Sequence, residues 1–312
     1  MGVYLGIDTS NYTTSCALYD TSDGSIRSCK QLLPVKEGER GIRQSDAVFH
    51  HTKQLPGLME ELFSSQTDIS ACAYSYAPRE VEGSYMPCFL VGENVCRSVA
   101  SVYSKPVFRT SHQKGHVLAA LYSCGKLSFL DNDEPFLAFH VSGGTTDMLL
   151  CRRDEEKVVS LKEIGSSTDL KAGQCIDRTG VRMGLSFPCG RELEKLALKS
   201  IREFRIRPSI KRLDCSLSGV ENKCSAMLEK GESREDTAKF CLEYICETIS
   251  AMTAAGLKEY GEMPVIYAGG VMADKLIADK LKTRFDAYFA APELSCDNAV
   301  GIAVYAAMKG KI

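Results

Sequence analysis

Residues 5–20 read LGIDTSNYTTSCALYD, and residues 138–152 repeat the same plan as AFHVSGGTTDMLLCR. Each stretch has an apolar run, a short turn of small or hydroxyl-bearing residues and a second apolar run, which is the pattern of a β-hairpin. One such hairpin opens each half of the chain, so the sequence predicts a duplicated core. Strand and helix patterns alternate through the rest of the chain, which favours an α/β protein over an all-β or all-α one.

Glycine-rich turns give this core a candidate nucleotide site. Ser142, Gly143 and Gly144 form the second hairpin turn, where small residues let backbone N–H groups converge on an anion. A plain β-turn is the ordinary alternative for either hairpin alone, and the repeat weakens that alternative. A third site is an apolar strand, then Gly269 and Gly270, then an amphipathic helix, an arrangement that favours anions at the helix N-terminus.

These three sites predict two similar lobes that close over a nucleotide, the architecture of actin, sugar kinases and the Hsp70 ATPase (the ASKHA fold). We expect an N-terminal lobe over 1–131, with the first hairpin and a histidine-bearing helix, and a C-terminal lobe over 132–312. The last helix is expected to pack back on the N-terminal lobe.

The composition is that of an ordinary globular protein. The chain has 312 residues, 44% of them hydrophobic and 25% charged, with a formal charge of -2, so any nucleic-acid surface must be local. One basic stretch, 200–215, is either a surface for RNA phosphates or a solvated loop; its cations are Arg202, Arg205, Arg207, Lys211 and Arg212. The sequence shows no signal peptide and no membrane-spanning stretch, so we expect a cytoplasmic protein without membrane partners. Its 14 cysteines lack C-x-x-C spacing and indicate buried reduced thiols.

Two histidines lie four residues apart in RTSHQKGHVLAAL, residues 109–121. His112 and His116 share one face of the helix that this apolar run predicts, so both imidazoles can bind one metal ion. The alternative is two polar residues on an exposed first helical turn, with Ser111 as the N-cap. Gln113 follows the first histidine, so the H-E-x-x-H motif of zinc proteases and its general base are missing. Asp297 is a candidate third ligand, or otherwise a cap of the final helix.

Six motifs in chain order resemble the TsaD family of tRNA threonylcarbamoyladenosine transferases, formerly called glycoproteases. They are HQKGH (112–116), VSGGTT (141–146), AGQCIDRTGVRMGLSFPCGRELEKLA (172–197), SLSGVENK (216–223), YAGGVMAD (267–274) and PELSCDNAVGIA (292–303). The resemblance covers essentially the whole chain. It implies metal ligands at His112, His116 and Asp297. It also implies adenylate contacts at His140, Val141, Ser142, Gly143, Gly144, Asp177, Gly190, Gly269, Gly270 and Asp274.

The activity that the resemblance implies is transfer of a threonylcarbamoyl group from an ATP-derived adenylate to the exocyclic amine of a tRNA adenosine, with release of AMP. It implies one divalent metal ion, and two imidazoles with one carboxylate suit Fe²⁺ or Zn²⁺. Expected partners are tRNA and the other proteins of the threonylcarbamoylation system, or a second copy of the chain.

The sequence also departs from the family. Tyr12 and Thr13 replace an acidic pair, Gln44 and Ser45 replace a Pro-Glu, and Phe49 replaces an arginine before His51. Leu170 replaces an aspartate, Gln174 a glutamate and Asp274 a ribose-contacting asparagine. The chain therefore looks like a divergent paralogue, and two alternatives stay open: a catalytically silent nucleotide-binding partner of a true transferase, and carbamoyl transfer to a small molecule. Kinase activity is less favoured, because Asp8 is the only strong candidate base in the first hairpin.

Overall fold

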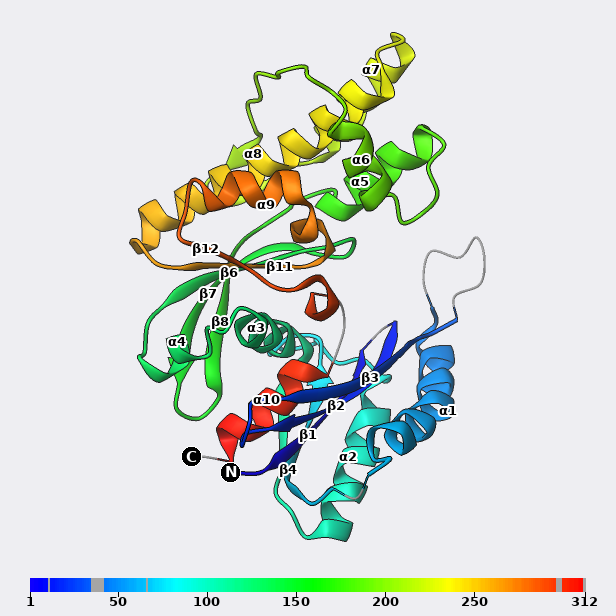
Figure 1. Ribbon diagram of the computed structural model, residues 1–312, viewed down its shortest axis with the longest axis vertical. Coiled ribbons are helices and arrows are strands. Elements are labelled where there is room, and N and C mark those ends of the chain that lie inside the picture. The colour runs from blue at the N-terminus through cyan, green and yellow to red at the C-terminus, as the bar shows by residue number, and fades with distance from the viewer. Residues whose placement is uncertain (11, 35–41, 66, 296–298, 311–312) are drawn as a thin grey trace. The chain divides into compact units, whose positions relative to one another are not determined.

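The computed structural model describes residues 1–10, 12–34, 42–65, 67–295 and 299–310. The chain forms two compact units (Figure 1). Unit 1 comprises Met1–Leu130, Arg153–Ser160 and Cys296–Ile312, and unit 2 comprises Asp131–Arg152 and Leu161–Ser295.

Unit 1 is built on a five-stranded sheet with the strand order β3-β2-β1-β4-β5. Strands β1 and β2 pair antiparallel, as do β2 and β3, whereas β4 runs parallel to both β1 and β5. The strand bounds are β1 Val3–Ser10, β2 Thr13–Asp20, β3 Ile26–Leu32, β4 Ile69–Ala77 and β5 Val107–Ser111.

Helices cover both faces of this sheet (Figure 1). Helices α1 (Gln44–Leu62) and α2 (Phe89–Tyr103) pack on one face, where the Thr9 hydroxyl donates to the Cys88 carbonyl oxygen at 3.0 Å. Helices α3 (His112–Ser123) and α10 (Val300–Lys309) pack on the other. A Cβ at Gly6 would lie 2.3 Å from the Ala303 backbone nitrogen, so this glycine allows α10 to approach β1 closely. The short helix α4 is Ser128–Asp131.

Unit 2 is built on a second five-stranded sheet, with the order β12-β11-β6-β7-β8. Its strands are β6 Phe136–Val141, β7 Thr146–Asp154, β8 Val158–Ser166, β11 Val265–Ala268 and β12 Ala287–Phe289. Phe139, Tyr267 and Phe289 stack across three neighbouring strands, with ring centroids 5.2 and 4.9 Å apart. The buried Tyr267 hydroxyl lies 2.8 Å from the hydroxyl of Thr253 in α8, which fixes α8 against this face of the sheet.

The other elements of unit 2 are short, apart from α8. They are α5 Ala172–Arg182, α6 Gly190–Ala197, β9 Ile210–Lys211, β10 Asp214–Cys215, α7 Ser218–Glu229, α8 Arg234–Tyr260, η1 Gly270–Ala273, α9 Lys275–Lys282 and η2 Pro292–Leu294. None of the helices in the described ranges is long and apolar enough to cross a membrane.

Both predicted hairpins are present. Strands β1 and β2 pair in the register Thr9↔Thr14, and β6 and β7 pair in the register His140↔Asp147. The third glycine site also has its predicted strand and helix, with a 3₁₀ turn between the glycines and the helix. Gly270 starts a 3₁₀ turn, and α9 begins only at Lys275, because the Asp274 side chain caps it by accepting from the Ile277 N–H at 3.1 Å. The order of strand, two glycines and helix is therefore as predicted.

Candidate functional site

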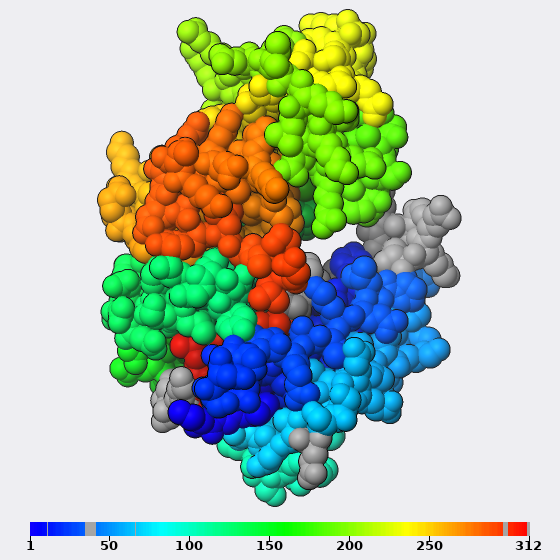
Figure 2. All heavy atoms as spheres, viewed as in Figure 1, coloured from blue at the N-terminus to red at the C-terminus, as the bar shows by residue number. Residues whose placement is uncertain are grey.

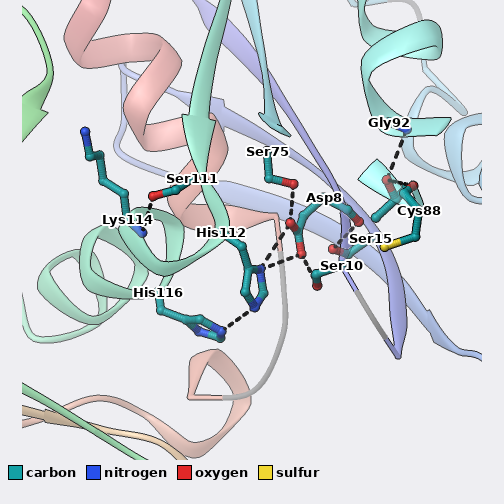
Figure 3. A network of polar contacts seen from close by, with 11 residues as sticks. Asp8, Ser10, Ser15, Ser75, Cys88, Gly92, Ser111, His112, Lys114 and His116 are labelled. Atoms are coloured by element: carbon teal, nitrogen blue, oxygen red, sulfur yellow. Dashed lines mark hydrogen bonds and ion pairs between the residues drawn. The ribbon is translucent and has the colours of Figure 1, made fainter. Parts of the chain in front are cut away.

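The two predicted metal-binding histidines of unit 1 lie on the first turns of α3. Strand β5 leads directly into this helix, and the Ser111 hydroxyl caps it by accepting from the Lys114 N–H at 3.3 Å. His112 therefore sits at the carboxyl edge of the parallel strands, where open α/β sheets bind ligands. The Nε2 atoms of His112 and His116 lie 2.9 Å apart (Figure 3).

Asp8 of β1 lies behind His112 and is fully buried. Its carboxylate oxygens are 3.1 and 3.2 Å from the Nδ1 atom of His112 (Figure 3). Ser10 Oγ donates to Oδ2 at 2.7 Å, and Ser75 Oγ donates to Oδ1. Burial alone raises the pKa of Asp8, but the charge of His112 and the hydrogen bonds from His112, Ser75 and Ser10 outweigh burial and lower it. The site thus contains an anionic carboxylate in a dry environment.

A divalent cation fits this donor set. Two imidazole nitrogens converge, and a carboxylate holds the far nitrogen of one ring, as in many histidine metal sites. In a tetrahedral zinc site two nitrogen ligands lie ~3.3 Å apart, so the pair needs to open only slightly. Within the described ranges no three His, Cys, Asp or Glu side chains are grouped to hold a metal ion. Asp297, the predicted third ligand, lies outside the described residues.

The second hairpin of unit 2 forms a tight polar turn between β6 and β7. The backbone N–H groups of Gly144 and Thr145 both donate to Ser142 Oγ, at 3.3 and 3.2 Å. The Thr145 hydroxyl in turn lies 2.8 Å from Ser142 Oγ and 3.4 Å from His140 Nδ1. Both N–H groups thus converge on the Ser142 hydroxyl, and a phosphate group would have to replace this hydroxyl as their acceptor.

The N-terminus of α5 meets this turn, a feature that sequence reasoning missed. The Gly173 N–H donates to the Ser142 carbonyl oxygen at 3.1 Å, and a Cβ at Gly173 would lie 2.6 Å from the Gly143 nitrogen. Only glycine allows the helix end to come so close, and the helix dipole then adds positive potential at the turn. Gly269 also lies against this edge of the sheet, with a φ of +102°. The signal available in the sequence was Gly173, the second residue of the motif 172–197.

A cavity of about 500 Å³ lies in unit 2, where α6 and α9 come together (Figure 2). Three predicted nucleotide contacts line it, namely Gly190, Gly270 and Asp274. Burial raises the pKa of Asp274 to about 6; the Ile277 N–H opposes this shift and the nearby Glu194 adds to it. The remaining lining residues are Arg191, Glu194, Lys195, Leu198, Ala273, Lys275 and Pro292.

Asp177 is placed beside this cavity rather than in its lining. Its Oδ1 accepts from the Cys189 N–H at 2.9 Å and so holds the residue that precedes Gly190. Burial raises the pKa of Asp177, and the Cys189 hydrogen bond partly opposes that shift.

The departures from the family occupy two kinds of position. Tyr12 and Phe49 are exposed, at 36% and 57%, and Ser45 is also exposed, on the first turn of α1. Leu170 is buried in the core of unit 2, where an aspartate would be costly. Gln174 accepts from the Lys171 N–H at 3.4 Å and closes a capping box on α5. Three further departures belong to the interior or its edge: Thr13 is buried, Gln44 accepts from the Cys88 N–H at 3.3 Å and Asp274 caps α9.

Two hairpin-bearing α/β units with glycine turns define the ASKHA class of proteins. Among solved structures, full-length HypF in its phosphate- and nucleotide-bound form has a TM-score of 0.63 at 13% identity, covering 100% of this chain and 55% of HypF. Component A of (R)-2-hydroxyglutaryl-CoA dehydratase from Acidaminococcus fermentans has a TM-score of 0.56 at 14% identity, covering 100% of both chains. A ROK family glucokinase from Streptomyces griseus, in complex with glucose and AMPPNP, has a TM-score of 0.52 at 11% identity, covering 98% of this chain and 99% of the kinase. Such identities establish the fold alone.

The family follows from the sequence match. The family model TsaD, described as tRNA N6-adenosine threonylcarbamoyltransferase, matches residues 31–304. The chain belongs to the TsaD family.

Proposed function

We propose that this protein transfers a threonylcarbamoyl group from an ATP-derived adenylate to the exocyclic amine of a tRNA adenosine. The observation that carries the proposal is the convergence of His112 Nε2 and His116 Nε2 at 2.9 Å in front of the buried, anionic Asp8. A member of the TsaD family with this donor set has the means to hold a cation beside a phosphate ester.

The proposal assigns roles to residues of each unit. His112 and His116 hold Fe²⁺ or Zn²⁺, with Asp297 as the proposed third ligand. A divalent cation bound there supplies Lewis-acid stabilisation of the phosphate that leaves. Within unit 2, the Ser142–Thr145 turn donates backbone hydrogen bonds to a phosphate of the nucleotide, and the cavity around Gly190 and Asp274 receives the nucleoside. The amine nitrogen bonds to the carbamoyl carbon as the carbon–oxygen bond to AMP breaks, and the amine loses a proton.

The proposed tRNA surface is the stretch between α6 and α7. Four cations there are exposed and form no ion pair in this described segment: Arg205, Arg207, Lys211 and Arg212. Arg202 differs, because its Nη1 lies 2.5 Å from Glu232 and 3.6 Å from Asp236. Unpaired surface cations are the ones that can neutralise RNA phosphates. We propose that the protein acts on tRNA in the cytoplasm, with protein partners or as a homodimer.

The test is calorimetric titration of AMP and of a non-hydrolysable threonylcarbamoyl-adenylate analogue into zinc-loaded protein. We expect binding by the wild type, loss of analogue affinity in His116→Ala and unchanged affinity in Ser15→Ala, which removes a buried hydroxyl outside the donor set. Mass spectrometry of tRNA nucleosides after incubation with the adenylate then reports transfer. Failure of the analogue to bind any form of the protein contradicts the proposal.

A second candidate function is that of a catalytically silent protein that binds nucleotide and partners a true transferase. It is favoured by the uncharged residues at three of the positions where the chain departs from the family. Tyr12, Thr13 and Ser45 stand where the family has acidic side chains, which a reaction centre would use. The same experiment separates the two: binding of the analogue without any modified tRNA, even with the family's partner proteins present, favours the silent partner. Modification of a small carbamoyl acceptor in place of tRNA favours the third alternative.

A further inference from the structure

We propose that Asp8 is a positioning residue that fixes the tautomer of His112, and that Ser75 is the hydroxyl donor that holds Asp8 in place. The inference rests on the proposed function in one respect, namely that His112 Nε2 is a cation ligand. It deepens that function by assigning the outer contacts of the ligand.

The assignment follows from counting protons around the carboxylate. Ser10 Oγ donates to one oxygen of Asp8 at 2.7 Å, Ser75 Oγ donates to the other, and His112 Nδ1 contacts both. Nδ1 lies 3.2 and 3.1 Å from the two carboxylate oxygens, the geometry of one N–H shared between two acceptors, so the proton between Asp8 and His112 is assigned to Nδ1. In a neutral imidazole the lone pair then resides on Nε2, the atom that points at His116.

The carboxylate has little freedom to leave this position. Asp8 is 0% exposed on the central strand β1, and its partners come from β1 itself, β4 and α3. His112 is 18% exposed at its side chain, so its anchored nitrogen lies inside while the ring still reaches the surface. A fixed anion behind a ligand imidazole orients the ring and increases the basicity of the ligating nitrogen.

Ser15 provides a matched control for Ser75. Its hydroxyl is also buried and close to Asp8, but it donates to the Asp8 backbone carbonyl at 3.2 Å rather than to the carboxylate. Ser75→Ala therefore removes a donor to the carboxylate, whereas Ser15→Ala removes an equal volume and one buried hydroxyl nearby.

Two measurements on the full chain test the inference. Long-range ¹H–¹⁵N spectra of the metal-free protein, with His112 assigned by its absence in His112→Gln, report which ring nitrogen carries the proton. We expect the Nδ1–H form in wild type and Ser15→Ala, and an increased Nε2–H fraction in Asp8→Asn, whose amide can donate to Nδ1. Competition for Zn²⁺ with a chromophoric chelator should show a loss of about 10- to 100-fold in affinity for Asp8→Asn, several-fold for Ser75→Ala and none for Ser15→Ala.

The two readouts separate this inference from the proposed function. An Nε2–H tautomer in folded wild type, or equal Zn²⁺ affinity in wild type, Asp8→Asn and Ser75→Ala, overturns the role of Asp8. If wild type shows the Nδ1–H form but binds no divalent cation, the positioning of His112 stands and the metal-dependent function fails. Circular dichroism and thermal unfolding establish that each variant is folded. If Asp8→Asn does not fold, the comparison of Ser75→Ala with Ser15→Ala still tests the inference.

Discussion

His51 of α1 is a buried imidazole whose protonation should destabilise unit 1 in mild acid. The ring is 0% exposed, and its Nδ1 lies 2.8 Å from Thr14 Oγ1. Gln54 donates its amide to the Leu32 carbonyl at 3.1 Å, so its oxygen accepts the Thr14 hydroxyl proton at 2.6 Å. His51 Nδ1 must therefore be the donor to Thr14, and Nε2 carries a buried lone pair with no hydrogen-bond partner among the described residues.

Burial lowers the pKa of His51 from 6.5 to about 4; the anionic Asp8 opposes that shift, and His50 adds to it. Because the folded pKa lies below the unfolded one, the unfolded chain binds the proton more readily. The contribution to stability is present above pH 6.5 and is lost as the pH falls towards 4. For this difference in pKa, linkage gives a loss of about 2 kcal/mol between pH 7 and pH 5.

Urea unfolding at pH 7, 6 and 5 measures this loss. His51→Gln removes the titrating group. Between pH 7 and pH 5, the free energy of unfolding of this variant should therefore fall by about 2 kcal/mol less than that of wild type, whatever the stability of the variant at pH 7. His50→Gln, a change at the neighbouring, partly exposed histidine, leaves the buried His51 ring in place, so most of the wild-type pH dependence should remain. Equal pH dependence in wild type and His51→Gln would show that protonation of His51 does not destabilise the protein in mild acid.

Three further predictions concern other charged groups. Lys114 is 1% exposed and its Nζ lies 2.9 Å from Glu80. Glu80→Gln should lower the free energy of unfolding by roughly 2–3 kcal/mol, because it leaves a buried cation without its carboxylate. Adding Lys114→Met should recover most of that loss in urea unfolding. Asp274→Asn should stabilise the protein by roughly 1–3 kcal/mol at pH 7, since Asn is an equally good N-cap. The gain arises because the raised pKa makes the buried carboxylate unfavourable above pH 6. No gain should remain at pH 4, as urea unfolding at the two pH values would show. Arg205→Ala should reduce the salt dependence of tRNA binding by about one phosphate contact, whereas Arg202→Ala, which breaks an existing ion pair, should change it less.

The features that the sequence predicts are those that depend on neighbouring residues. The two hairpins follow from alternation over a few positions, and His112 and His116 meet because residues four apart share a helix face. The contacts of Asp8 with Ser75 and His112 join residues 67 and 104 positions apart. Which strands pair with β1 decides these contacts, and no local pattern in the chain gives that pairing. The 3₁₀ turn after Gly270 was missed for a related reason, since Asp274 selects a later start for α9.

Burial separates the Asp8 network from the three exposed departures from the family. Asp8 is 0% exposed and its carboxylate accepts from three side chains, so a substitution there leaves several buried polar groups without partners. Tyr12, Ser45 and Phe49 are exposed, and replacing charged residues at such positions costs little stability. Changes at these exposed positions can alter what approaches the site without disturbing the Asp8 network. The exposed departures therefore bear on the surface that meets an acceptor or partner, and not on the buried Asp8 network.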